Sequence, residues 1–79
     1  MDHYKELVPD KATAVAIAEV VAVKIYGKDV IGRQRPLVAK KEGGNWIVQG
    51  TMAQGRLGGV VLIKLQAKDC RVLRVTHGR

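Results

Sequence analysis

The sequence predicts an α+β fold in which one N-terminal helix packs on a four-stranded antiparallel sheet. A run over residues 11–26 without glycine or proline comes first, and after Pro36 four short runs follow in which apolar and polar residues alternate. With 79 residues in all, the chain is long enough for one domain only. We therefore expect a single domain over 1–79, with an arm over 1–8 and the helix and sheet over 9–79.

The helix is predicted over 11–26 because both of its ends carry recognisable signals. Asp10 can accept hydrogen bonds from the first free N–H groups, and its charge suits the positive end of the helix dipole. Gly27 can supply the positive φ at which many helices end. One face of this helix gathers apolar residues that we expect to contact the core: Ala14, Ile17, Ala18, Val21 and Ile25.

The opposite side of the helix is apolar as well. Ala12, Ala16 and Val23 lie there, and Glu19 is one of its few charges. A helix that is apolar nearly all round is normally buried on more than one side, whereas a sheet this small covers only one. Two explanations stay open: the segment 4–8 folds back over the helix, or a protein partner covers it. In the second case we expect a homodimer through Ala12, Ala16 and Val23.

After the helix, residues 27–36 are predicted to form a connection in which Val30 and Ile31 contact the core. A hairpin follows, and its adjacent Gly43 and Gly44 suit a two-residue turn. With that turn, the core side of the hairpin carries Leu37, Ala39, Trp46 and Val48, and the outer side carries Val38, Lys40, Ile47 and Gln49.

The second hairpin is predicted to turn over three residues, 68–70, because of its hydrophobic pattern. A two-residue turn would place Arg74 in the core, since a shift of one residue moves every side chain to the other face. With three turn residues the core side carries Val61, Ile63, Leu65, Leu73 and Val75. The outer side then carries Val60, Leu62, Lys64, Gln66, Val72, Arg74 and Thr76.

The outer side of the predicted sheet mixes aliphatic side chains with basic and amide ones. This mixture is too apolar for a fully solvated surface and too polar for a core, and it is typical of the centre of a non-obligate protein interface. The glycine-rich loop between the hairpins adds one more basic residue. We therefore expect a partner to contact Arg56, Val60, Leu62, Lys64, Val72 and Arg74.

The chain is strongly basic, with 14 Lys and Arg against 7 Asp and Glu, a net charge of +7 and a pI of about 10.0. Such a charge attracts nucleic acid, an acidic membrane surface or an acidic protein. Nucleic-acid-binding modules usually place aromatic side chains among the basic ones, but Tyr4, Tyr26 and Trp46 lie far apart in the sequence. No apolar run approaches the roughly 20 residues that cross a bilayer. These observations weaken the interpretation as a nucleic-acid-binding module without removing it, and an acidic protein stays open as a partner.

The sequence offers few residues for catalysis. It contains no serine, and Cys70 and His77 are predicted at opposite ends of one strand, beyond hydrogen-bond reach. His3, His77 and Cys70 also lack the spacing of zinc ligands. We therefore expect a binding protein and not an enzyme, with no catalytic residue, metal or cofactor. The single cysteine agrees with a reducing, cytoplasmic compartment, or with the periplasm if an upstream signal was removed.

Five short motifs and one proline, in their order along the chain, resemble those of one family: Val8-Pro9-Asp10, Ile25-Tyr26-Gly27, Pro36, Trp46 to Thr51, Gly58-Gly59-Val60 and Val75 to Gly78. Over about residues 8–79 the sequence is similar to small bacterial immunity proteins with a nuclear-transport-factor-two-like fold. Such proteins are encoded beside toxins in polymorphic toxin and contact-dependent or type VI secretion systems. The resemblance implies a cystatin-like half-cone of helix and sheet, and a non-catalytic protein that binds and blocks a cognate toxin.

The resemblance implies structural roles for motif residues such as Trp46, Gly50 and His77, so no toxin-binding residue is taken from it. The chain differs from the family at Cys70, where a glycine is expected, which leaves the type of the last turn open. We expect neutralisation by occlusion through the outer side of the sheet, with an acidic toxin surface and an association rate that depends on salt. The alternative is a small basic module that binds nucleic acid, which a steep salt dependence of binding to random strands would reveal.

Overall fold

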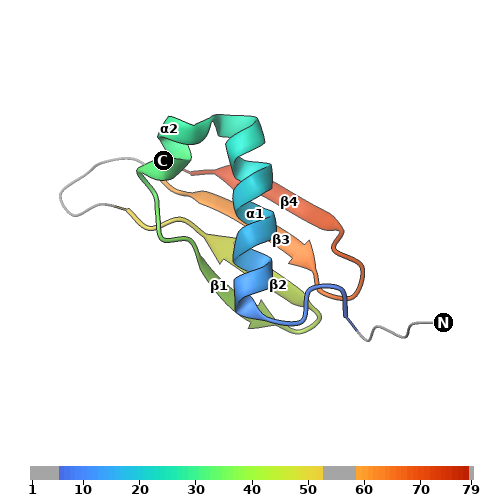
Figure 1. Ribbon diagram of the computed structural model, residues 1–79. Helices are drawn as coiled ribbons and strands as arrows, with labels where there is room; N and C mark the ends of the chain where they lie inside the picture. The colour runs from blue at the N-terminus through green and yellow to red at the C-terminus, as the bar shows by residue number, and fades with distance from the viewer. Residues whose placement is uncertain (1–5, 53–58, 79) are drawn as a thin grey trace.

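A computed structural model describes residues 6–52 and 59–78 of the chain. Four strands form one antiparallel sheet in the order β1 (Val38–Glu42), β2 (Asn45–Gln49), β3 (Val61–Gln66) and β4 (Val72–His77). Helix α1 (Lys11–Tyr26) lies across one face of the sheet, and the short helix α2 (Lys28–Gly32) follows it (Figure 1). The predicted α+β arrangement of one main helix on four strands is confirmed.

Helix α1 begins and ends where the sequence signals place its ends. Asp10 Oδ1 accepts a hydrogen bond from the Thr13 backbone N–H at 2.8 Å, as an N-cap residue does. The hydrogen bonds from Thr13 hold the pKa of Asp10 below its usual value. At the other end Gly27 adopts a φ of +95° and its N–H donates to the Val23 carbonyl at 2.8 Å.

The face that α1 turns towards the sheet is the predicted one except at its last position, Ile25. Ala14, Ala18 and Ala22 are fully buried, whereas Ile25, which we expected in the core, is 53% exposed. Apolar side chains surround α1 on nearly all sides, so periodicity alone does not select one face. Alanine leaves room for the helix backbone to approach the sheet closely, and the larger Ile17 and Val21 are partly buried at the edge of the core.

Residues 27–36 contain a helix where we predicted only a connection. Lys28–Gly32 form α2. This helix has only five residues, it follows Gly27 and it ends at Gly32, so hydrophobic periodicity could not predict it. The two predicted anchors are confirmed, because Ile31 is fully buried and Val30 packs against the core. Neither of the helices in the described residues is long and apolar enough to cross a membrane.

The first hairpin has the predicted register. Glu42 lies opposite Asn45 and Ala39 opposite Val48, and Gly43 in the turn has a φ of +59°. Such a φ is strained for any residue with a β-carbon, which explains the glycine. The residues predicted for the core side are all buried, namely Leu37, Ala39, Trp46 and Val48.

The second hairpin follows the predicted register along most of its length, with Ile63 opposite Val75 and Lys64 opposite Arg74. Its turn, however, is longer than predicted. The Gln66 N–H donates to the Arg71 carbonyl at 2.8 Å, so the turn has four residues, Ala67–Cys70, and not three.

A β-bulge beside Leu65 absorbs the extra turn residue, and it changes two predicted positions. Val72, expected on the outer side, lies opposite the buried Leu65. Leu73, expected in the core, is 42% exposed. Both expectations assumed a regular ladder up to the turn.

The described part of the N-terminal arm contacts the sheet and not the outer side of α1. The Val8 N–H donates to the Ala67 carbonyl at 2.9 Å, and the Val8 carbonyl accepts a hydrogen bond from Trp46 Nε1 at 2.8 Å. Val8 is fully buried and Trp46 nearly so, which places this tryptophan in the core as the resemblance implied. For Glu6–Val8 the expectation of a segment folded over α1 is wrong, and residues 4 and 5 lie outside the described residues.

Candidate functional site

The side of the sheet away from α1 carries the candidate site, which we call the outer face. Side chains alternate between the two sides of a strand, and in β3 the buried Val61, Ile63 and Leu65 alternate with half-exposed residues. The same alternation in the other strands gives the outer face eleven residues in all: Val38, Lys40, Glu42, Asn45, Ile47, Gln49, Leu62, Lys64, Gln66, Arg74 and Thr76.

A row of one aliphatic and three basic side chains crosses the outer face. The pairing of the strands places Lys40 opposite Ile47, Ile47 opposite Lys64 and Lys64 opposite Arg74. Because neighbouring strands lie about 4.8 Å apart, this row spans roughly 14 Å across all four strands. The next row contains Leu62, so the basic groups have apolar surface beside them.

The pairing of Lys64 with Arg74 is unfavourable for the sheet itself. Like charges directly opposite each other on neighbouring strands destabilise the pair. Within the described residues neither side chain has an acidic partner, whereas Lys40 lies 3.8 Å from Glu42. A positive charge on this face is therefore kept at a cost to folding.

The residues predicted to contact a partner are only partly brought together. Lys64 and Arg74 are direct neighbours, and Leu62 lies two residues along β3 on the same side. Val60 is half-buried just before β3, and its carbonyl accepts a hydrogen bond from the Gly78 N–H at 3.2 Å. Val72 is 43% exposed at the bulge and leaves the outer face, as described above. Arg56 lies outside the described residues.

Gln34, which the sequence analysis did not single out, fixes the end of the sheet where β3 begins. Its side chain is buried; Oε1 accepts from the Val61 N–H at 2.7 Å, and Nε2 lies 2.9 Å from His77 Nε2. Since Oε1 is occupied as an acceptor, Nε2 donates to the histidine ring. A β-carbon at Gly50 would lie 2.4 Å from Gln34 Oε1, so only glycine fits beside this amide.

This contact network gives physical reasons for two motif residues. Gly50 allows the close approach of Gln34, and His77 accepts its amide hydrogen. The ring of His77 also lies 5.1 Å from that of Tyr26 at the end of α1. The network therefore ties β3 and β4 to the end of α1. No spacing or composition signal marks a glutamine for such a role.

The outer face offers surface for binding and no evident group for covalent chemistry. Cys70 precedes β4 and His77 ends it, so the two lie at opposite ends of that strand. In the part of the chain that the structure describes, no three His, Cys, Asp or Glu side chains gather where a metal ion could bind. Apart from Glu42, which lies beside Lys40, the charged side chains of the outer face are basic, and aliphatic side chains lie next to them.

Comparison with known proteins agrees with this fold. The sequence profile of a family described as "NTF2 fold immunity protein" matches residues 13–79. The chain is also 32% identical over 76 residues to the uncharacterised protein YhhH of Escherichia coli (strain K12). That similarity covers 95% of the chain but only 60% of the length of YhhH. No solved structure matches the chain.

Proposed function

Because this chain belongs to the NTF2 fold immunity protein family, we propose that it binds a cognate toxin and neutralises it by occlusion, without catalysis of its own. The family supports a role in immunity, and an immunity protein needs a surface that fits its toxin. In this proposal the outer face of the sheet is that surface.

The observation that carries the proposal is the positive charge of Lys64 and Arg74, which have no acidic partner among residues 6–52 and 59–78, on a surface that is otherwise partly apolar. Like charges directly opposite each other destabilise a sheet, and positions where a protein departs from such a rule are often functional. A toxin with an acidic surface would place carboxylates against both groups and relieve their repulsion.

The aliphatic residues of the face complete the fit. Leu62 and Ile47 lie beside the basic row and are each half-buried, so a partner could cover them with little rearrangement. The backbone beneath them is held by strand pairing on both sides, which lowers the entropy that binding must remove. Val60 would extend the contact at the start of β3, whereas Val72, which leaves the outer face, is not part of it.

The proposed setting is a bacterial polymorphic toxin or type VI secretion system, in which the producing cell protects itself and its siblings. Neutralisation would take place in the cytoplasm, where a single free cysteine such as Cys70 stays reduced. The net charge of +7 would speed encounter with an acidic toxin and make the association rate fall as salt rises.

The test measures association with the toxin encoded by the neighbouring open reading frame. Replacing both Lys64 and Arg74 with Glu inverts the charge of the face but keeps a like-charge pair, so the fold should be equally stable. At low salt we expect association to slow by about tenfold or more. The matched control replaces Lys11 and Arg33, both exposed on other elements, with Glu and changes the net charge equally.

If both double variants associate with the toxin at the same rate, the outer face is not the binding surface. If the wild-type protein binds random duplex DNA with a steep salt dependence and does not bind the toxin, the chain is a basic nucleic-acid-binding module. If the toxin stays active in the complex, neutralisation by occlusion is wrong even though binding is real.

A further inference from the structure

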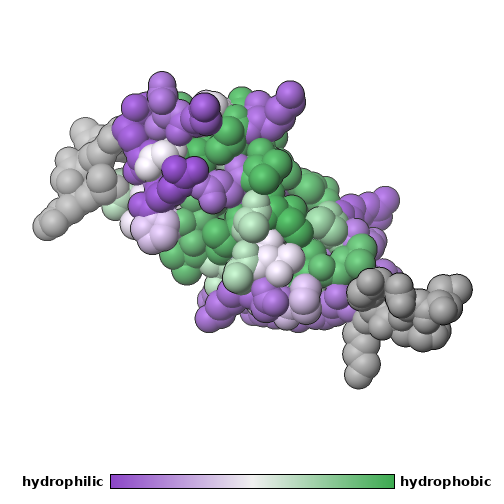
Figure 2. All heavy atoms as spheres, viewed as in Figure 1, coloured by the Kyte–Doolittle hydropathy of each residue, from purple (hydrophilic) through white to green (hydrophobic). Residues whose placement is uncertain are grey.

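The side of α1 that faces solvent is a second unpartnered apolar surface. Figure 2 shows hydrophobic side chains in a band across the face of the molecule that carries α1. Ala12, Ala16 and Val20 follow one another at intervals of four residues and are all exposed. Val20 is 72% exposed, which is high for an aliphatic side chain in the middle of a helix.

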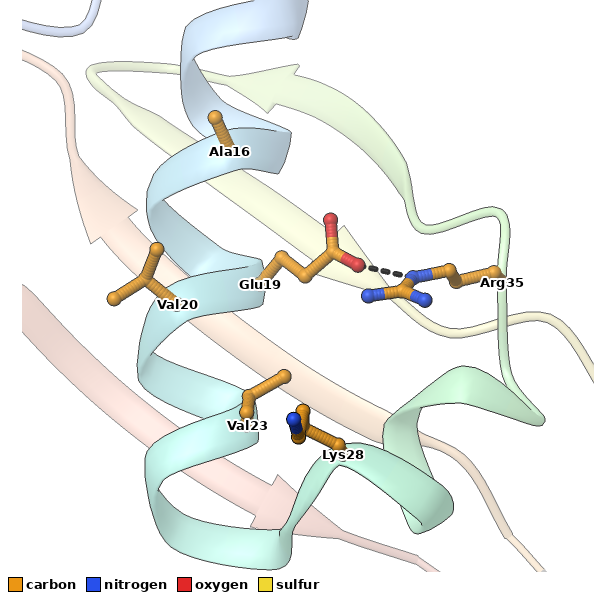
Figure 3. A pocket seen from close by; sticks show the side chains of 6 residues that line it. All are labelled: Ala16, Glu19, Val20, Val23, Lys28 and Arg35. Carbon is orange, nitrogen blue, oxygen red and sulfur yellow. Dashed lines mark hydrogen bonds and ion pairs between the residues drawn. The ribbon is translucent and has the colours of Figure 1, made fainter.

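Beside Val20 lies an open hollow of about 440 Å³. Its lining, shown in Figure 3, consists of Ala16, Glu19, Val20, Val23, Lys28 and Arg35. The four α1 residues stand at positions i, i+3, i+4 and i+7. In packed helices, a set of four side chains with that spacing forms the hole that accepts one side chain of the facing helix.

The rim of the hollow carries charges of both signs. Glu19 pairs with Arg35, which reaches across from the segment between α2 and β1 (Figure 3). Lys28 lies near Val23 on the same rim and has no ion pair among the described residues. A partner that brings a carboxylate next to an apolar side chain would therefore fit this rim.

We propose that the occupant is a second copy of this chain, packed through α1 against α1 about a two-fold axis. Such an interface must be self-complementary, and this side of the molecule carries both halves of the contact next to each other: Val20 on α1 and the hollow that Lys28 and Arg35 help to line. Val20 of each copy enters the hollow of the other. Glu19, its neighbour in the sequence, comes close to Lys28 of the second copy, so the charges of the two rims are complementary.

The dimer is weak and leaves the toxin-binding surface free. A 16-residue helix is about 24 Å long, so a contact through α1 buries less than the standard interface of about 1,600 Å². Each chain also carries a charge of +7, which opposes association unless salt screens it. Because α1 and the outer face lie on opposite sides of the sheet, the dimer presents two outer faces that point away from each other.

Sedimentation equilibrium on the full chain from about 1 µM to 1 mM, at 0.3 M salt to screen the net charge, tests the proposal. We expect a reversible monomer–dimer equilibrium, and we expect Val20→Lys to raise the dissociation constant tenfold or more, because it places a cation against Lys28 and Arg35. The matched control is Val38→Lys, which alters a valine that is 57% exposed on the other side of the sheet and should leave the constant unchanged. Circular dichroism checks that both variants fold.

Reversing the charges at positions 19 and 28 tests whether the two chains pack in the specific way proposed or associate non-specifically through apolar surface. Glu19→Lys and Lys28→Glu each place like charges together in their own homodimers, so each variant alone should dissociate tenfold more readily. In an equimolar mixture both contacts become attractive, and native mass spectrometry should show mainly the heterodimer. A wild-type chain that stays monomeric up to about 1 mM, equal effects of Val20→Lys and Val38→Lys, or a random mixture of dimers would each overturn the proposal.

Discussion

At the scale of single residues, the backbone conformation at Cys70 explains why a glycine is expected at this position. Cys70 has a φ of +65°, the left-handed region in which a β-carbon is strained. A glycine, which the family resemblance leads one to expect at this position, adopts the same φ without strain. The four-residue turn thus needs a residue that tolerates positive φ, and the chain supplies a less suitable one.

Replacing Cys70 with Gly should therefore raise the free energy of unfolding by about 0.5–1 kcal/mol. The loss of the packing of the partly buried thiol reduces this gain. Urea denaturation measures the change. Cys70→Ala is the control, because it removes the thiol and keeps the β-carbon, and it should give no gain. If Ala and Gly stabilise the chain equally, backbone strain at this position is not the cause.

The contact between Gly50 and Gln34 gives a second prediction at this scale. Gly50→Ala should lower the free energy of unfolding by about 1–3 kcal/mol, because the new methyl group overlaps the buried Gln34 amide. In a chain that already carries Gln34→Ala, the same substitution should cost much less, since the overlapping atoms are gone. Thermal unfolding of the four chains completes the cycle, and equal costs in both backgrounds would contradict the proposed overlap.

At the scale of elements, local sequence determines the two ends of α1, whereas packing on the sheet determines which of its side chains are buried. Its ends depend on residues close in sequence, Asp10 with Thr13 and Gly27 with Val23, and these could be predicted. Its buried face was predicted at Ala14 and Ala18, but the burial of Ala22 and the exposure of Ile25 depend on how α1 packs on the sheet. Because nearly all sides of α1 carry apolar residues, the sequence pattern does not show which of them the sheet covers.

The same distinction applies to the sheet and to the candidate site. The positions of Lys64 and Arg74 could be predicted because the core pattern of β3 and β4 sets their register. The position of Val72 could not, since the bulge depends on a turn that is one residue longer than the hydrophobic pattern requires. Gln34 is far from its partners along the chain, so only the folded structure brings them together.

The N-cap of α1 makes a testable contribution to acid stability. Hydrogen bonds from Thr13 lower the pKa of Asp10 in the folded chain below the 3.8 of an unperturbed carboxyl. Its stabilising effect is therefore fully present above the unfolded-state pKa and is lost as the pH falls through the folded-state value. Asp10→Ala should melt below the wild type at pH 7, and the difference should shrink as the pH drops through 4 towards 2. A difference that is constant with pH would show that the charge of Asp10 does not contribute.

At the scale of the whole molecule, the net charge of +7 has opposite effects on folding stability and on the binding of an acidic partner. Repulsion among like charges destabilises the compact state, and the same charge draws an acidic partner. On the outer face this conflict is concentrated in one cross-strand pair, Lys64 with Arg74. Reducing the positive charge there should therefore have opposite effects on folding and on toxin binding.

A cycle of charge reversals separates the local pair from the total charge. Lys64→Glu and Arg74→Glu each create an opposite-charge pair and should each raise the free energy of unfolding by about 0.2–1 kcal/mol, whereas the double variant restores like charges and loses the gain. The net charge meanwhile falls steadily, by two per substitution, from +7 to +5 and +3. Association with the toxin should slow at each step, so stability and association rate follow different courses through the same four proteins. A direct contact between positions 64 and 74 depends on the product of their two charges. If the free energy of unfolding instead changes steadily with net charge, repulsion over the whole molecule and not this pair determines the stability.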